Sequence, residues 1–113
     1  MIVSKASNAE AFENSPVCHG VSYGETGDDI DGAIITVSGR YPQSGFLVNE
    51  MSKELVYITS GSGKLIGREG SKNFSKGDVI FIDNREEFAW NGTFEGFFAT
   101  TPKFNPAQHK EVA

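Results

Sequence analysis

Glycines interrupt this chain at short and fairly regular intervals from Gly32 onward. Between them lie runs rich in β-branched and aromatic residues, among them GAIITVSG, ELVYITSG, DVIFID and TFEGFFATTP. Short apolar runs bounded by turn residues are typical of the strands of a β-sandwich or barrel. No sustained 3.6-residue apolar period follows residue 30, so the sequence predicts an all-β chain with little helix.

Length and composition narrow the functional classes. The 113 residues leave room for one domain, and the 38% of hydrophobic residues suffice for a core. The net charge of −5 argues against a nucleic-acid partner, because neutralising phosphates requires a basic surface. Apolar runs of signal-peptide or membrane-spanning length are missing, so we expect a cytoplasmic protein with no membrane partner. The single Cys18 can form neither an internal disulfide nor a thiolate metal site.

Several polar segments predict where the chain turns. Asn91-Gly92 predicts a two-residue hairpin, and Gly61-Ser62-Gly63 predicts a second connection between strands. Glu69-Gly70 and Lys76-Gly77-Asp78 predict two more turns, so the second half is interpreted as a meander of hairpins. Near the start, Ser7-Asn8-Ala9-Glu10 fits a capping box for a helix of one or two turns.

The run ELVYIT is apolar on both of its strand faces. Successive side chains of a strand point in opposite directions, so Glu54 shares a face with Val56 and Ile58. Leu55 and Tyr57 make the other face apolar as well. Two apolar faces predict a barrel whose outer wall is covered by a second sheet or by a partner subunit. We therefore expect a homodimer.

Residues 39–92 resemble the cupin superfamily of small jelly-roll barrels. Glu54 and Gly61, with six residues between them, are similar to the second half of the first cupin motif, and Gly77-Asp78 is similar to the opening of the second. The segment Thr101–Pro106 is similar to the Pro-x-Phe ending of many cupins.

The resemblance implies a cupin-type jelly-roll β-barrel, also called a double-stranded β-helix. Residues 1–113 would then form a single cupin-like domain around the motif region 39–92. Residues 1–30 would supply N-terminal strands or an arm, and residues 101–113 a C-terminal tail.

The metal-binding histidines of the cupin motifs are absent from this chain. Positions 47–50, where the His-x-His pair would fall, hold Leu-Val-Asn-Glu, and the third histidine is replaced by Phe88. Of the four ligands that the resemblance implies, only Glu54 remains. Transition-metal sites of this kind need imidazole ligands, so we expect no metal and no other cofactor.

The two histidines lie outside both motifs. We interpret His19 and His109 as partly exposed or core residues, because nothing in their spacing suggests a shared site. Cys18 and His19 are adjacent, and adjacent strand residues point to opposite faces, so they cannot form a nucleophile–base dyad.

The candidate ligand-binding residues are Glu54, Asn49, Phe88 and Trp90. A Glu54 carboxylate inside the barrel must be paired, hydrogen-bonded or protonated; the alternative is a rim carboxylate paired with a basic neighbour such as Arg40. Phe88 and Trp90 share a strand face and form either an aromatic pocket wall or, for Phe88, a plug of the cavity. Asn49 either aims its amide at a ligand or belongs to an ordinary turn.

Three functions remain open. The loss of the histidines beside a retained Glu54 favours a metal-free protein that binds a small molecule, such as a sugar or a polar metabolite. The second is an isomerase- or epimerase-like enzyme that uses Glu54 as its base, although no second acid or base is visible in the motif region. The third is a structural or regulatory module whose barrel is filled and binds no ligand.

Overall fold

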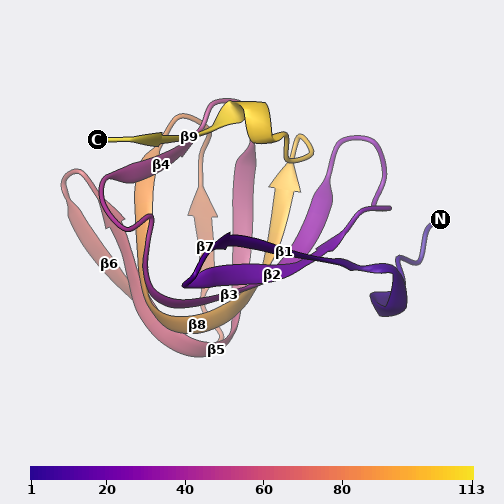
Figure 1. Cartoon of the computed structure of the whole chain (residues 1–113), viewed down its shortest axis with the longest axis horizontal. Helices are drawn as coiled ribbons and strands as arrows, with labels where there is room; N and C mark the ends of the chain where they lie inside the picture. The colour runs from indigo at the N-terminus through magenta and orange to yellow at the C-terminus, as the bar shows by residue number, and fades with distance from the viewer.

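The computed structural model describes residues 1–113 and consists of antiparallel strands that curl into a half-barrel (Figure 1). The strands are β1 (Glu10–Ser15), β2 (Cys18–Tyr23), β3 (Asp31–Tyr41), β4 (Phe46–Asn49), β5 (Lys53–Gly67), β6 (Gly70–Ser75), β7 (Val79–Ile82), β8 (Glu87–Thr101) and β9 (His109–Val112). Two 3-10 turns, η1 (Ala6–Asn8) and η2 (Pro106–Gln108), are the only helical segments. The predicted all-β class is confirmed. No helix has the length and apolarity needed to cross a membrane.

The long strands β5 and β8 form the centre of the sheet. One path of pairing runs β1-β2-β3-β8-β4-β9, and β5 joins it by pairing with β8. The other neighbours of β5 are β6 along its second half and β7 along its first half. Because β5 and β8 are curled, the sheet wraps around one concave face (Figure 1).

Two of the predicted turns are wrong, because the strands continue through these glycines. Asn91-Gly92 lies within β8, and Gly61-Ser62-Gly63 lies within β5. Gly39, Gly92 and Gly63 face one another across β3, β8 and β5. A Cβ on Gly92 would lie 2.5 Å from the Gly63 Cα, so only glycine permits this close approach. Glycine inside a strand is typical of sites where another backbone approaches closely, as at this row.

The other predicted turns are found where expected. Glu69-Gly70 closes the β5–β6 hairpin, in which Gly67 pairs with Gly70. Lys76-Gly77-Asp78 joins β6 to β7, but these two strands both pair with β5 and not with each other, so the predicted meander of hairpins is wrong. At the N-terminus the predicted capping box is wrong, because η1 has no side-chain cap and the chain enters β1 at Glu10.

The concave face holds the core. Val56 and Ile58 of β5 point into it together with Glu54, as predicted. Phe74, Trp90 and Phe94 pack edge-on or tilted, with ring centroids 4.9 to 5.7 Å apart. Such aromatic contacts add to the stabilisation that burial alone provides.

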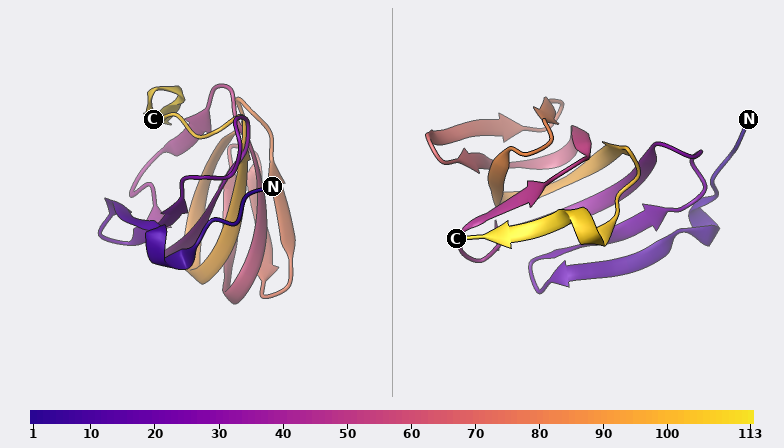
Figure 2. Two further views of the ribbon diagram at one scale, coloured as in Figure 1. Left: turned by 90° about the vertical axis from the view of Figure 1, so that its right-hand side faces the viewer. Right: turned by 90° about the horizontal axis from the view of Figure 1, so that it is seen from above.

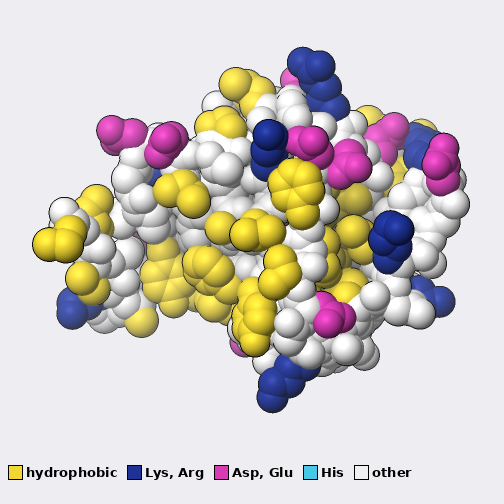
Figure 3. All heavy atoms as spheres, turned by 180° about the vertical axis from the view of Figure 1, so that it is seen from behind, with side chains coloured by type: hydrophobic (Ala, Val, Ile, Leu, Met, Phe, Trp, Pro, Cys, Tyr) yellow, Lys and Arg dark blue, Asp and Glu magenta, His cyan; other side chains and the backbone are white.

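The convex face of β5, β7 and β8 is also apolar. Its exposed side chains are between 41% and 62% accessible and are Leu55, Tyr57, Val79, Phe81 and Phe97. Strand register places Val79, Tyr57 and Phe97 side by side. Apolar side chains gather over these strands on the face behind that of Figure 1 (Figure 3).

The C-terminal residues return to the sheet. Strand β9 pairs with β4, and the two lie side by side above the curl of the barrel (Figure 2). The N-terminal strands β1 and β2 extend the sheet beyond β3. Both ends of the chain thus contribute walls around the concave face.

Candidate functional site

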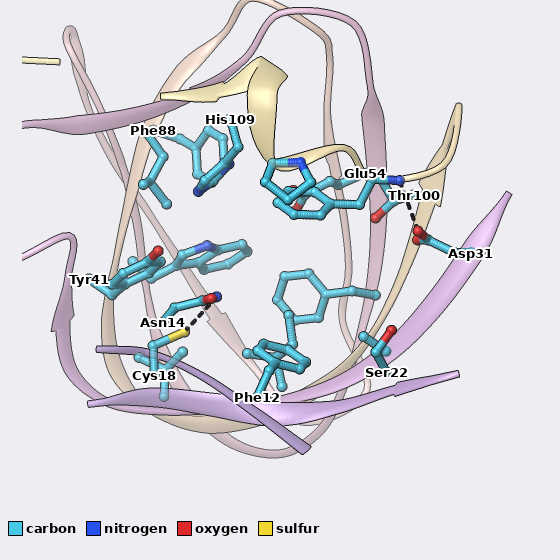
Figure 4. Close-up of a pocket in the computed structure, with 18 residues that line it drawn as sticks. Phe12, Asn14, Cys18, Ser22, Asp31, Tyr41, Glu54, Phe88, Thr100 and His109 are labelled. Carbon is cyan, nitrogen blue, oxygen red and sulfur yellow. Dashed lines mark hydrogen bonds between the residues drawn. The ribbon is translucent and has the colours of Figure 1, made fainter. Parts of the chain in front are cut away.

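A cavity of about 400 Å³ lies on the concave side of the sheet (Figure 4). Its walls come from β1, β2, the inner faces of β3, β5 and β8, and the returning tail with Phe104, Pro106 and His109. Phe88 and Trp90 both line it, so Phe88 does not plug the barrel. A space of this size is typical of small-molecule sites.

Glu54 lies at the wall of this cavity with 8% of its surface exposed. Its Oε1 accepts a hydrogen bond of 2.7 Å from the Asn49 side-chain amide. Burial raises the pKa of Glu54 to about 7, against the smaller lowering effect of the Asn49 hydrogen bond, and nearby Asp31 raises it further. Near neutral pH the carboxyl group therefore exists in both its protonated and its ionised form.

Asn49 connects Glu54 to His109. Strand register sets Asn49 of β4 directly opposite His109 of β9, and the Asn49 Oδ1 lies 2.7 Å from the His109 Nδ1. Because Oδ1 can only accept, His109 Nδ1 donates. Burial lowers the pKa of His109 below its usual 6.5, which favours neutral imidazole with an unprotonated Nε2. We call Glu54, Asn49 and His109 the polar chain of the site.

The tail that carries His109 is tied down by further hydrogen bonds. The Gln108 Oε1 accepts from the backbone N–H groups of Met51 and Ser52, at 2.8 and 3.1 Å. The Asp31 Oδ2 accepts from the Phe104 backbone N–H at 2.8 Å. These contacts hold the imidazole above the cavity, as Figure 4 shows.

The Cys18 thiol and the Tyr41 hydroxyl, which also line the cavity, are neutral. Burial raises the pKa of Cys18 to about 11 and that of Tyr41 to about 12. The Cys18 thiol also receives a weak hydrogen bond from the Asn14 amide, 3.9 Å long. A thiol held in its protonated form is a poor nucleophile, so these two groups offer polarity and not charge.

The structure brings all four candidate residues together. Glu54, Phe88 and Trp90 line the cavity, and Asn49, 1% exposed, lies behind Glu54. Glu54 is not a rim carboxylate, because its bond goes to an amide and the Arg40 guanidinium donates to the backbone carbonyls of Pro42 and Gly45. No three side chains of the types His, Cys, Asp and Glu come together in an arrangement able to hold a metal ion.

Sequence reasoning missed His109, which lines the cavity, while His19 is exposed. One local signal was present: Asn105 caps η2 by accepting from the Ala107 N–H, with Pro106 in the first turn. That signal marks a turn before residue 109. It does not reveal that the strand after it pairs with β4. Cys18 is buried and its neighbour His19 is not, in agreement with the exclusion of a dyad.

No protein-family model matches this chain, and no curated protein matches it. Several solved structures, however, are similar to it. The chain is similar to Pac13, a nucleoside dehydratase, with 18% identity and a TM-score of 0.86 over 99% of this chain and 91% of that one. It is similar to the polyketide cyclase RemF from Streptomyces resistomycificus, with 14% identity and a TM-score of 0.76 over 100% and 86% of the two chains.

A third similar structure is a cupin. It is an RmlC-like cupin from Shewanella frigidimarina, with 13% identity and a TM-score of 0.70 over 92% of this chain and 93% of that one. The chain therefore has the cupin fold, as its motifs predicted.

Proposed function

We propose that this protein is an acid–base enzyme acting on a small, ring-bearing molecule held in the cavity. The observation that carries the proposal is the polar chain, which presents a carboxyl group and a neutral imidazole at one end of an otherwise largely apolar pocket. Enzymes tune carboxyl groups toward neutral pH by burial, because an acid or base works best when its pKa is close to the working pH.

The two groups have complementary roles. His109 Nε2 accepts a proton from a carbon of the substrate, while protonated Glu54 donates its proton to an oxygen of the substrate. If that oxygen is a hydroxyl, it leaves as water, and the reaction is a dehydration. If it is a carbonyl, an enol forms, and return of a proton gives an isomer. In the dehydration, transfer of the proton from His109 to Glu54 through solvent restores both groups. In the isomerisation, His109 gives its proton to the other carbon and the enol returns its proton to Glu54.

The similar structures support this class of reaction. Pac13 is a nucleoside dehydratase, and a variant of Streptomyces Pac13 with uridine has a TM-score of 0.87 to this chain. RemF is a cyclase. Both act on small organic molecules, and ring-bearing compounds suit a cavity with Phe88, Trp90 and Phe98 in its wall.

The test is proton exchange in deuterium oxide. Uncharged nucleosides and keto sugars are incubated with the protein, and proton NMR follows loss of a C–H signal or the appearance of a vinyl proton. Glu54→Gln and His109→Gln should each slow the reaction about 10²- to 10⁴-fold. His19→Gln is the matched control, because His19 is exposed on β2, and it should leave the rate unchanged.

Binding without turnover is the second candidate. One observation favours it: the only direct hydrogen-bond partner of the Glu54 carboxylate is an amide, which cannot exchange protons with it. A compound that binds in the cavity but shows neither exchange nor product would reject the enzyme and leave the binding protein.

A further inference from the structure

Three polar side chains form a row across the sheet beside the polar chain. Strand register places Asp31 of β3 opposite Thr100 of β8, and Thr100 opposite Glu54 of β5. Directly opposed residues of antiparallel strands have Cβ atoms about 4.5–5.5 Å apart and share one face. All three line the cavity, and Figure 4 shows them together along one side. We call Asp31, Thr100 and Glu54 the polar row.

The polar row keeps hydrogen-bonding capacity free. Thr100 is only 6% exposed, and none of the side-chain hydrogen bonds of the chain uses its hydroxyl group. Glu54 uses Oε1 for Asn49, and Asp31 uses Oδ2 for the Phe104 N–H, so each carboxyl group retains a second oxygen. The Thr100 hydroxyl is not fully buried, so it opens onto the cavity and is free to bond a ligand that has polar groups of its own.

The cavity carries no positive side chain. Its 18 lining residues include two carboxyl groups and no Lys or Arg. Two basic side chains from adjoining segments are engaged elsewhere: Arg40 donates to the carbonyls of Pro42 and Gly45, and Lys103 donates to the carbonyl of Gly24 at 3.2 Å. A phosphate or carboxylate in this cavity would meet carboxyl groups with no compensating charge, which is costly for a buried anion.

From the free polar groups of the row and the absence of cations we infer that the polar row binds the hydroxyl groups of an uncharged, sugar-bearing ligand such as a nucleoside, and excludes its phosphorylated form. A ligand hydroxyl group donates to an ionised carboxyl group or accepts from a protonated one, and the Thr100 hydroxyl both donates and accepts. The aromatic side chains of the lining are then left for the ring of the ligand. This inference rests on the proposed function for the location of the site and specifies which molecules enter it.

Isothermal titration calorimetry with matched pairs tests the exclusion of charge. The probes are adenosine, guanosine, cytidine and uridine, each beside its 5′-monophosphate. We expect at least one nucleoside to bind and its monophosphate to bind at least about tenfold more weakly, because the phosphate lacks a counter-charge. The inference is overturned if no nucleoside binds at millimolar concentration, or if a monophosphate binds as tightly as its nucleoside.

A pair of neighbouring threonines tests the polar row. Thr100→Val keeps the shape of the side chain and removes its hydroxyl group, and Thr101→Val makes the same change on the exposed face of β8. Loss of one hydrogen bond predicts about fivefold weaker nucleoside binding for Thr100→Val and no change for Thr101→Val. Equal affinities for both variants, at unchanged thermal midpoints, would remove Thr100 from the binding site.

The two proposals fail in different ways. Nucleoside binding that is sensitive to Thr100 but yields no proton exchange retains the polar row and rejects the acid–base enzyme. Exchange with a ligand that carries a phosphate or carboxylate retains the enzyme and rejects the uncharged ligand.

Discussion

The two faces of β5 have similar apolar content but different environments. On the concave face, Val56 and Ile58 are fully buried, and Glu54 beside them lines a cavity. On the convex face, Leu55 and Tyr57 are about half exposed. Burial on the concave face comes from the curl of β5 and β8 and from the two chain ends that close over it. The comparison shows that hydrophobic pattern alone does not determine which face of a curved sheet becomes the core.

Two phenylalanines test the comparison directly. Phe94→Ala removes a buried ring from the concave face, where it contacts Phe74 and Trp90 and does not line the cavity. It should lower the free energy of unfolding by about 3–5 kcal/mol. Phe81→Ala removes an exposed ring from the convex face and should cost less than about 1 kcal/mol at low protein concentration. Urea unfolding of both variants measures the difference, and equal costs would contradict it.

Glu54 gives the concave face a pH dependence that the convex face lacks. Its folded-state pKa of about 7 exceeds the ordinary 4.5, so the folded state binds the proton more tightly. The contribution of Glu54 to the free energy of unfolding is therefore greatest below pH 4.5 and is lost as the pH rises toward 7. Glu54→Gln stays neutral, so its advantage over the unsubstituted protein should grow by on the order of 3 kcal/mol between pH 4.5 and 8.

Urea unfolding of the two proteins across this pH range measures that growth. The other ionisable groups are shared, so they cancel in the difference. A difference in the free energy of unfolding that does not change with pH would show that Glu54 keeps its ordinary pKa in the folded protein.

The expected homodimer stays a prediction, and the convex face is where we expect its contact. Light scattering should give twice the 12.2 kDa of one chain. Phe81→Lys puts a charge among the exposed apolar side chains and should yield single chains, at a cost to association of about 2 kcal/mol. Lys72→Ala, on the exposed surface of β6, serves as the control. A monomer at micromolar concentration for the unsubstituted protein would reject the homodimer.

The smallest of these effects on stability is expected for the titration of His109. Burial lowers its pKa, so NMR titration should place it below the ordinary 6.5. The folded state then resists protonation, and the contribution of His109 to stability is lost as the pH falls below 6.5. A His109 pKa above 6.5 would contradict the lowering of the pKa by burial.

Much of the candidate site was predictable from local pattern. Alternation placed Glu54 inward with Val56, and the same rule put Phe88 and Trp90 on one face. The position of Asn49 shortly before Glu54 predicted that it belongs to the site, and its amide does reach that carboxyl group. His109 was not predictable, because its place depends on β9 pairing with β4 across 60 residues of sequence.

The sequence by itself determined the strand class, the turns after β5 and β6, and the inward carboxyl group, because these follow from side-chain alternation and turn chemistry over a few residues. Only the tertiary structure decided that β8 continues through Gly92, that Glu54 is buried enough to titrate near neutral pH, and that His109 joins it through Asn49. Those properties depend on which distant strands lie opposite one another, and no local pattern encodes that register.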